Sequence, residues 1–62
     1  MLKIEIKTSN AAYSDDGYNI TTEGRYELQR NLMDISRKLT NGYNEGVIID
    51  INGNKVGKWS VN

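Results

Sequence analysis

Carboxylates are the main candidates for acid–base or nucleophilic chemistry in this 62-residue sequence, because it contains no His and no Cys. Asp15 and Asp16 are adjacent in the sequence, but adjacency alone does not direct two carboxylates at one substrate. A chain of this length also has little volume for a concave pocket of roughly 300–1,000 Å³, the usual size of a small-molecule site. We therefore expect no enzymatic activity and no catalytic residue.

A metal site would need several oxygen ligands at fixed spacing. The run Asp50–Asn54 resembles the start of a calcium loop, with oxygen-bearing side chains at alternate positions. That loop requires Gly at its sixth position and a carboxylate at its twelfth, where this chain has Lys55 and Val61. The run is better explained as a hairpin turn, and we expect no metal and no other cofactor.

The net charge limits the classes of partner. Eight Lys and Arg residues balance eight Asp and Glu residues, so bulk attraction to nucleic acid or to an anionic membrane is not expected. No apolar run approaches the roughly 20 residues of a membrane-spanning helix. Lys3, Lys7 and Lys58 could follow phosphates along one sheet face, although Glu5 and Asp50 interrupt it. Nucleic-acid binding is therefore an alternative to a simply solvated face.

Tyrosine and acidic residues gather in one irregular segment and are the best candidates for recognition of a protein. Tyr13 and Tyr18 flank Asp15 and Asp16. Tyrosine is enriched in interfaces because it combines a large contact area with a polar tip. Carboxylates beside it could engage a basic surface, including one that normally holds nucleic acid. The alternative to a recognition site is a surface loop in which one or both tyrosines cover the core.

Four elements must position these residues. Residues 1–8 alternate apolar and charged side chains, which predicts a half-buried strand with Leu2, Ile4 and Ile6 on one face. Its charged outer face suits an edge strand, because charges there discourage pairing with other chains. Residues 9–20 have no sustained period and contain the turn signal Asp16-Gly17, so we expect a loop.

A helix is predicted from Thr21 or Thr22, either of which could be its N-cap, to a stop at Asn41-Gly42. Gly24 should weaken its first turn by roughly 1 kcal/mol relative to Ala. Charge spacing predicts the ion pairs Arg30–Asp34 and Asp34–Lys38 on its solvent face. Its apolar stripe, which could be widened by Tyr26 and Met33, should pack on the sheet and consists of Leu28, Leu32, Ile35 and Leu39.

Residues 47–61 predict a β-hairpin around Asn52-Gly53, in either of two registers. A two-residue turn sets Ile49 opposite Val56 and places Trp59 on the other face. A three-residue loop, residues 52–54, sets Val47 opposite Trp59 and collects the larger apolar set on one face. We favour the three-residue loop, since a slip of one residue exchanges the faces and the core should decide. Asp50 should then face solvent beside Lys55 or Lys58.

The order of elements is therefore β-α-β-β in a single domain, residues 1–62. The economical arrangement is an α+β fold in which one helix covers one face of a three-stranded, mostly antiparallel sheet. We expect the first strand to pair with the last, which places Trp59 on the central strand. Pairing of the first strand with the second would instead require a parallel, right-handed crossover.

Three segments together carry a resemblance to a known group of proteins: Lys3–Tyr13, Leu32–Leu39 and Asp50–Gly57. The chain resembles small orphan proteins encoded by phages, prophages and mobile elements of Gram-positive bacteria. The similarity spans most of the chain apart from Ser14–Glu23, and no catalytic residue is attached to it.

The resemblance implies a cytoplasmic protein of the bacterial host that acts by binding a host protein. Its most specific form is a stoichiometric inhibitor of a defence system, of anti-CRISPR or antirestriction type, with a nuclease or defence effector as partner. Tyr13, Asp15, Asp16 and Tyr18 would make the contact. The alternatives are a nucleic-acid-associated accessory protein and a homo-oligomer that associates through an edge strand or an apolar patch.

Overall fold

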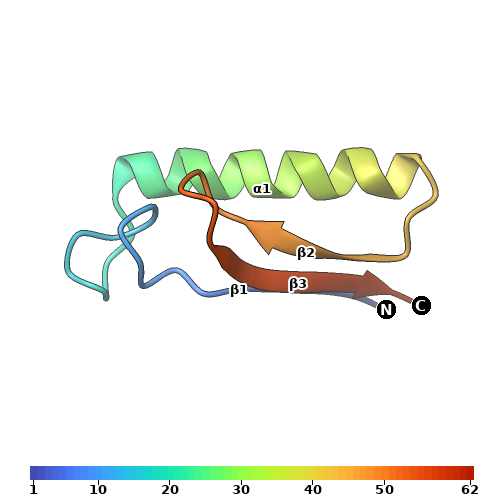
Figure 1. The fold of residues 1–62 in the computed structure, drawn as a ribbon, viewed down its shortest axis with the longest axis horizontal. Coiled ribbons are helices and arrows are strands. Elements are labelled where there is room, and N and C mark those ends of the chain that lie inside the picture. Colours follow the sequence, from blue (N-terminus) through green and yellow to red (C-terminus); the bar gives the residue numbers. More distant parts are fainter.

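The computed structural model describes all 62 residues and shows a helix lying over a three-stranded sheet (Figure 1). The elements are β1 (Leu2–Ile6), α1 (Thr22–Thr40), β2 (Glu45–Ile49) and β3 (Lys55–Val61). The sheet is antiparallel throughout and its order is β1-β3-β2. The predicted β-α-β-β fold is therefore confirmed, with β3 and its Trp59 in the centre. α1 does not have the combination of length and apolar sequence that a membrane-spanning helix needs.

β1 has the alternation that the sequence predicts. In the register with β3, Ile4 lies opposite Trp59 and Ile6 lies opposite Gly57. Side chains on one face of an antiparallel pair lie side by side, so the apolar residues of β1 share the face of Trp59, which is buried under the helix. The chain ends meet beyond this pair, where the Met1 amino group donates to Asn62 O at 3.0 Å.

The favoured register of the hairpin is wrong by one residue. Gly46, and not Val47, lies opposite Trp59, and Ile48 lies opposite Gly57. This is the register of the rejected two-residue turn along the body of the strands. A bulge then shifts the pairing, so that Ile49 lies opposite Lys55.

The bulge explains why neither sequence register was sufficient. One extra residue in a strand lets two consecutive side chains point to similar sides. Val56 occupies this position and is buried in the same cluster as Trp59 and Ile48. The bulge thus places Val56 and Trp59 on one face, which a regular strand cannot do at an odd spacing. Val47 and Ile49 lie on the opposite face and are substantially exposed.

α1 begins and ends where the sequence predicts. Thr21 is the N-cap, and its Oγ1 accepts a hydrogen bond from Gly24 N at 2.9 Å. The helix ends at Thr40 and is followed by Gly42 with φ of 91°, a conformation that favours glycine.

The predicted stripe is confirmed at Ile35, which is buried, and in part at Leu28 and Leu39, which pack against the core, but the buried face also includes polar residues. The buried residues of α1 are Gly24, Glu27, Asn31 and Ile35. Leu28 and Leu39 are only partly buried, and Leu32 is 47% exposed. The helix is rotated because its polar residues bond to other parts of the chain, as described below. Tyr26 and Met33 are also exposed and do not widen the packed stripe.

Gly24 has a packing role that its low helix propensity conceals. A Cβ atom at this position would overlap Tyr13 O and the neighbouring backbone. The same carbonyl oxygen accepts from Thr21 N at 2.9 Å. The start of α1 therefore lies directly against the backbone of residue 13, and only glycine permits this approach.

Candidate interaction surface

Tyr13 belongs to the core and not to a contact surface. Its side chain is fully buried, and its Oη donates to Asn31 Oδ1 at 2.7 Å. Burial raises the pKa of the Tyr13 phenol, and the nearby carboxylates of Glu27 and Asp50 raise it further. The ring cannot touch a partner in this structure, so we remove Tyr13 from the predicted contact residues. The structure follows the alternative in which a tyrosine of the loop covers the core.

The other predicted contact residues lie together in a tight acidic turn, Ser14–Ile20. A single bridge joins Ser14 to Ile20 and closes the turn. The Asp16 carboxylate accepts from Tyr18 N at 2.8 Å and from Asn19 N at 2.9 Å. It also accepts from the Ser14 hydroxyl and the Asn19 amide group. These N–H donors, with Asn19 N first, hold the pKa of Asp16 well below its usual range.

This geometry gives the acidic residues different roles. Asp16 is occupied by internal hydrogen bonds and fixes the backbone of the turn. Tyr18 is 90% exposed, and Asp15 is exposed beside it. Gly17, at φ of 83°, takes a conformation that other residues rarely adopt. The acidic turn therefore presents Tyr18 and Asp15 from a fixed backbone.

A polar connection between α1 and the hairpin was not predicted from the sequence. Glu27 accepts from Arg30 Nε and Nη2, each at 2.7 Å, and from Ile51 N at 2.8 Å. Arg30 thus pairs with Glu27 and not with Asp34 as predicted, whereas the Asp34–Lys38 pair is present at 3.2 Å. The Arg30 guanidinium is the largest cause that lowers the pKa of Glu27. The signal in the sequence was the three-residue spacing of Glu27 and Arg30.

Two further contacts attach this flank of the helix to β2. Ile49 O accepts from Arg30 Nη2 at 3.2 Å and from Asn31 Nδ2 at 3.4 Å. We call Glu27, Arg30 and Asn31 the polar flank of α1. Successive side chains are about 100° apart around a helix. This spacing places Leu28, Leu32 and Leu39 on one side of the row of buried residues and Arg30 on the other. We call these leucines the apolar flank, which lies on the side of α1 away from the contacts with Ile49 O of β2.

Asp50 is buried and does not face solvent beside a lysine as predicted. Its Oδ1 accepts from Asn52 N at 2.9 Å and from Asn54 N at 2.8 Å, and its Oδ2 accepts from Asn10 Nδ2 at 2.9 Å. These donors, with Asn54 N first, lower the pKa of Asp50. The carboxylate therefore closes the hairpin loop, with oxygens that a cation would need already bonded to N–H groups. No group of three or more acidic side chains is placed to hold a metal ion.

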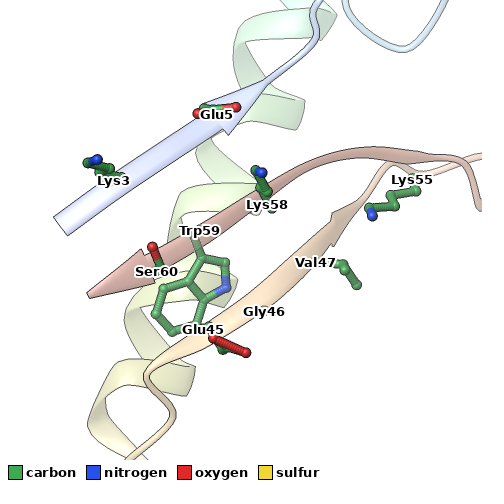
Figure 2. Close-up of a pocket in the computed structure, with 9 residues that line it drawn as sticks. All are labelled: Lys3, Glu5, Glu45, Gly46, Val47, Lys55, Lys58, Trp59 and Ser60. Atoms are coloured by element: carbon green, nitrogen blue, oxygen red, sulfur yellow. The ribbon is translucent and has the colours of Figure 1, made fainter. Parts of the chain in front are cut away.

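The open face of the sheet carries charges of both signs around a shallow hollow. Figure 2 shows these side chains along the three strands, with the Trp59 ring beside Gly46 between β3 and β2. Glu5 lies opposite Lys58 in the register of β1 and β3. The residues that line the hollow are Lys3, Glu5, Glu45, Gly46, Val47, Lys55, Lys58, Trp59 and Ser60. Lys7 lines the adjoining hollow.

The chain matches no protein-family model, no curated protein and no solved structure. The geometry of these surfaces and the resemblance noted in the sequence are therefore the basis for a functional proposal.

Proposed function

We propose that this protein acts by binding another protein through its acidic turn. The observation that carries the proposal is Tyr18, a large aromatic side chain that is 90% exposed on a turn fixed by the Asp16 carboxylate. A flexible loop would have to be ordered on binding, which costs about 0.5–1.5 kcal/mol for each immobilised rotamer-rich side chain. Here the backbone is already ordered by hydrogen bonds within the turn.

The chemistry of the turn indicates what kind of surface it fits. Tyr18 offers apolar area with a hydroxyl at its tip, and Asp15 adds a carboxylate with no hydrogen bond to the rest of the chain. Such a pair complements a surface with an apolar pocket beside Lys or Arg side chains. A protein surface that normally holds nucleic acid has this character.

The resemblance to proteins of phages and mobile elements supports a more specific form of the proposal. The partner is then a nuclease or effector of a bacterial defence system, and the protein is its stoichiometric inhibitor. In this form, the acidic turn occupies a basic site on the partner and competes with nucleic acid for it. Inhibition should be complete at one chain per site and should require no turnover.

The test is capture of a partner by the tagged full-length chain from lysates of Gram-positive bacteria, followed by measured affinities of turn variants. Tyr18→Ala should weaken binding about 30-fold or more, as expected for an interface hot spot worth at least about 2 kcal/mol. Tyr43→Ala is the matched control, because Tyr43 is an exposed tyrosine far along the sequence from the turn. Equal affinities of the wild-type chain and Tyr18→Ala for the captured partner would exclude the acidic turn as the contact.

A second candidate function is binding of nucleic acid by the open face of the sheet. The observation that favours it is that Lys3, Lys55 and Lys58 line the same hollow. Phosphate contacts of this kind predict binding that weakens steeply as salt is raised. A mobility shift on single-stranded and double-stranded probes at low salt, repeated with Lys58→Ala, decides this candidate. Absence of any shift at low salt removes it.

A further inference from the structure

The two edges of the sheet are not equally available for pairing. At the β2 edge, Ile49 O is already bonded to side chains of the polar flank, Arg30 and Asn31. At the other edge, β1 pairs only with β3 and no other strand or helix covers its outer side. An open edge of this kind is a template for another strand.

The hydrogen bonds around β1 show which of its backbone groups point outward. Lys7 N donates to Val56 O at 2.8 Å, and Met1 and Asn62 exchange hydrogen bonds at the other end of the pair. Inward and outward groups alternate along an antiparallel strand. The N–H and C=O groups of Lys3 and Glu5 therefore point to β3, whereas those of Leu2, Ile4 and Ile6 point to the open edge.

The side chains of these outward residues are also incompletely covered. Leu2 is 46% exposed and Ile4 is 37% exposed, although both lie on the helix side of the sheet. Of the three strands, β2 lies most closely against α1, and Leu2 and Ile4 form an incompletely covered apolar strip along the β1 edge. Any strand that pairs with β1 and carries apolar residues at alternate positions would cover this strip.

We propose that the occupant is a second copy of this chain, with the two β1 strands paired antiparallel about a two-fold axis at Ile4. In this register Ile4 faces its own counterpart and Leu2 faces Ile6 of the second copy. The outward N–H and C=O groups of all three residues then find partners across the axis. Lys3 of each copy faces Glu5 of the other at a non-hydrogen-bonded pair, where side chains approach most closely. The two sheets become one continuous sheet of six strands.

The charges of Lys3 and Glu5 favour the register centred on Ile4 and favour a second copy of the chain as the partner. A shift of the pairing by two residues places Lys3 opposite Lys3 or Glu5 opposite Glu5, and like charges directly opposite each other are destabilising. The alternation of charge that discourages pairing with an arbitrary strand is therefore self-complementary in a two-fold arrangement. This proposal does not depend on the function of the acidic turn, which lies outside β1.

Charge reversal provides the first test. Sedimentation equilibrium of the full chain should give about twice the 7.0 kDa chain mass at high concentration. K3E and E5K should each weaken the dimer roughly tenfold, because each creates two like-charge pairs across the axis. The double variant K3E/E5K restores opposite charges and should restore the dimer. A mixture of K3E and E5K should form heterodimers, since the acidic side chains of one then face the basic side chains of the other.

Amide exchange measured by NMR provides an independent readout, with circular dichroism confirming that each variant is folded. In the dimer the amide protons of Leu2, Ile4 and Ile6 should be protected, and in K3E at the same concentration they should exchange rapidly. A chain that remains monomeric at millimolar concentration overturns the proposal. So does a dimer whose affinity is unchanged in K3E and whose outward β1 amides exchange rapidly, because that dimer uses another surface.

Discussion

On the flank of α1 that faces β2, Glu27, Arg30 and Asn31 bond to the sheet and the hairpin, whereas on the opposite flank Leu32 is 47% exposed. One flank is held by hydrogen bonds, and the other is only partly packed, through Leu28 and Leu39. A simple amphipathic helix would show the reverse, with its leucines packed and its charges in water.

The difference shows how a small domain can define the position of its helix. Apolar contacts are non-directional and tolerate rotation of a helix about its axis. Glu27 accepts a hydrogen bond from Ile51 N, and Asn31 accepts one from Tyr13 Oη and donates one to Ile49 O, and such bonds are directional. The polar flank therefore sets the rotation of α1, and Leu32 turns outward as a consequence while Leu28 and Leu39 remain partly packed. That outward surface is available for contacts between molecules.

The largest expected effect comes from preventing the approach of α1 to the loop. In Gly24→Ala the added Cβ meets the backbone at Tyr13 O, which cannot move away as a flexible side chain could. We expect a loss of about 3 kcal/mol in the free energy of unfolding, at the upper end for overpacking. Urea denaturation followed by circular dichroism measures it. Gln29→Ala, at an exposed position of the same helix, is the control and should change little.

Removal of the central carboxylate of the polar flank should have the next largest effect. Glu27→Ala leaves Ile51 N without its acceptor and Arg30 without its partner. Because Arg30 is half exposed and can turn to water, we expect a loss of about 2 kcal/mol, mostly from the part-buried N–H group of Ile51. Glu23→Ala in the exposed first turn is the matched control. Equal stabilities of the two variants would mean that the polar flank does not hold the helix.

Acid should destabilise the unmutated chain through Glu27 of the polar flank and through Asp50, which closes the hairpin loop. Since the folded state lowers the pKa values of Glu27 and Asp50, it binds fewer protons than the unfolded state. The contribution of these two carboxylates to the free energy of unfolding is thus fully present above their unfolded pKa values of about 4. It is lost as the pH falls from there through the lower pKa values of the folded state. We expect a melting temperature that is steady from about pH 7 to pH 5 and then decreases toward pH 3. The decrease should be shallower in Glu27→Ala, and parallel curves would contradict this assignment.

The elements were predictable from the sequence, but the contacts between them were not. The alternation in β1, the N-cap at Thr21 and the stop at Gly42 are local signals, and the structure contains all three. The hairpin register failed because it depends on a bulge at Val56, which periodicity does not reveal. The buried face of α1 was predicted only in part. Ile35 is buried and Leu28 and Leu39 pack against the core, but Leu32 is exposed because Glu27 and Asn31 find partners from distant segments.

Part of the candidate site, the acidic turn, could be predicted because its sequence signal is local, whereas the burial of Tyr13 could not. Asp16-Gly17 is a local turn signal, and the structure contains a turn there with Tyr18 exposed. Whether a tyrosine lies inside or outside depends on what surrounds it. Tyr13 is buried because Asn31 receives its hydroxyl and Gly24 leaves room for its backbone. Neither partner can be identified by spacing alone.

Loss of the Tyr13 hydroxyl, which bonds to Asn31 of the polar flank, should have a smaller effect than loss of Glu27. Tyr13→Phe keeps the buried ring and removes the donor to Asn31 Oδ1. We expect a loss of about 1 kcal/mol, because one buried acceptor is left unpaired. Tyr26→Phe, at an exposed tyrosine of α1, should leave the free energy of unfolding unchanged. A Tyr13→Phe variant as stable as wild type would mean that this hydrogen bond is replaced without loss.

The smallest effect should come from the apolar flank, where the sequence stripe had predicted a core residue. Leu32→Ala removes a side chain that is 47% exposed, so little area returns to water and no cavity forms. We expect a loss below about 1 kcal/mol at concentrations where the chain is monomeric, whereas Ile35→Ala, at a buried position three residues further along α1, should lose about 3 kcal/mol. Denaturation of both variants side by side measures the rotation of the helix directly. If Leu32→Ala lost as much as Ile35→Ala, α1 would present its leucine stripe to the sheet after all, and the polar flank would face water.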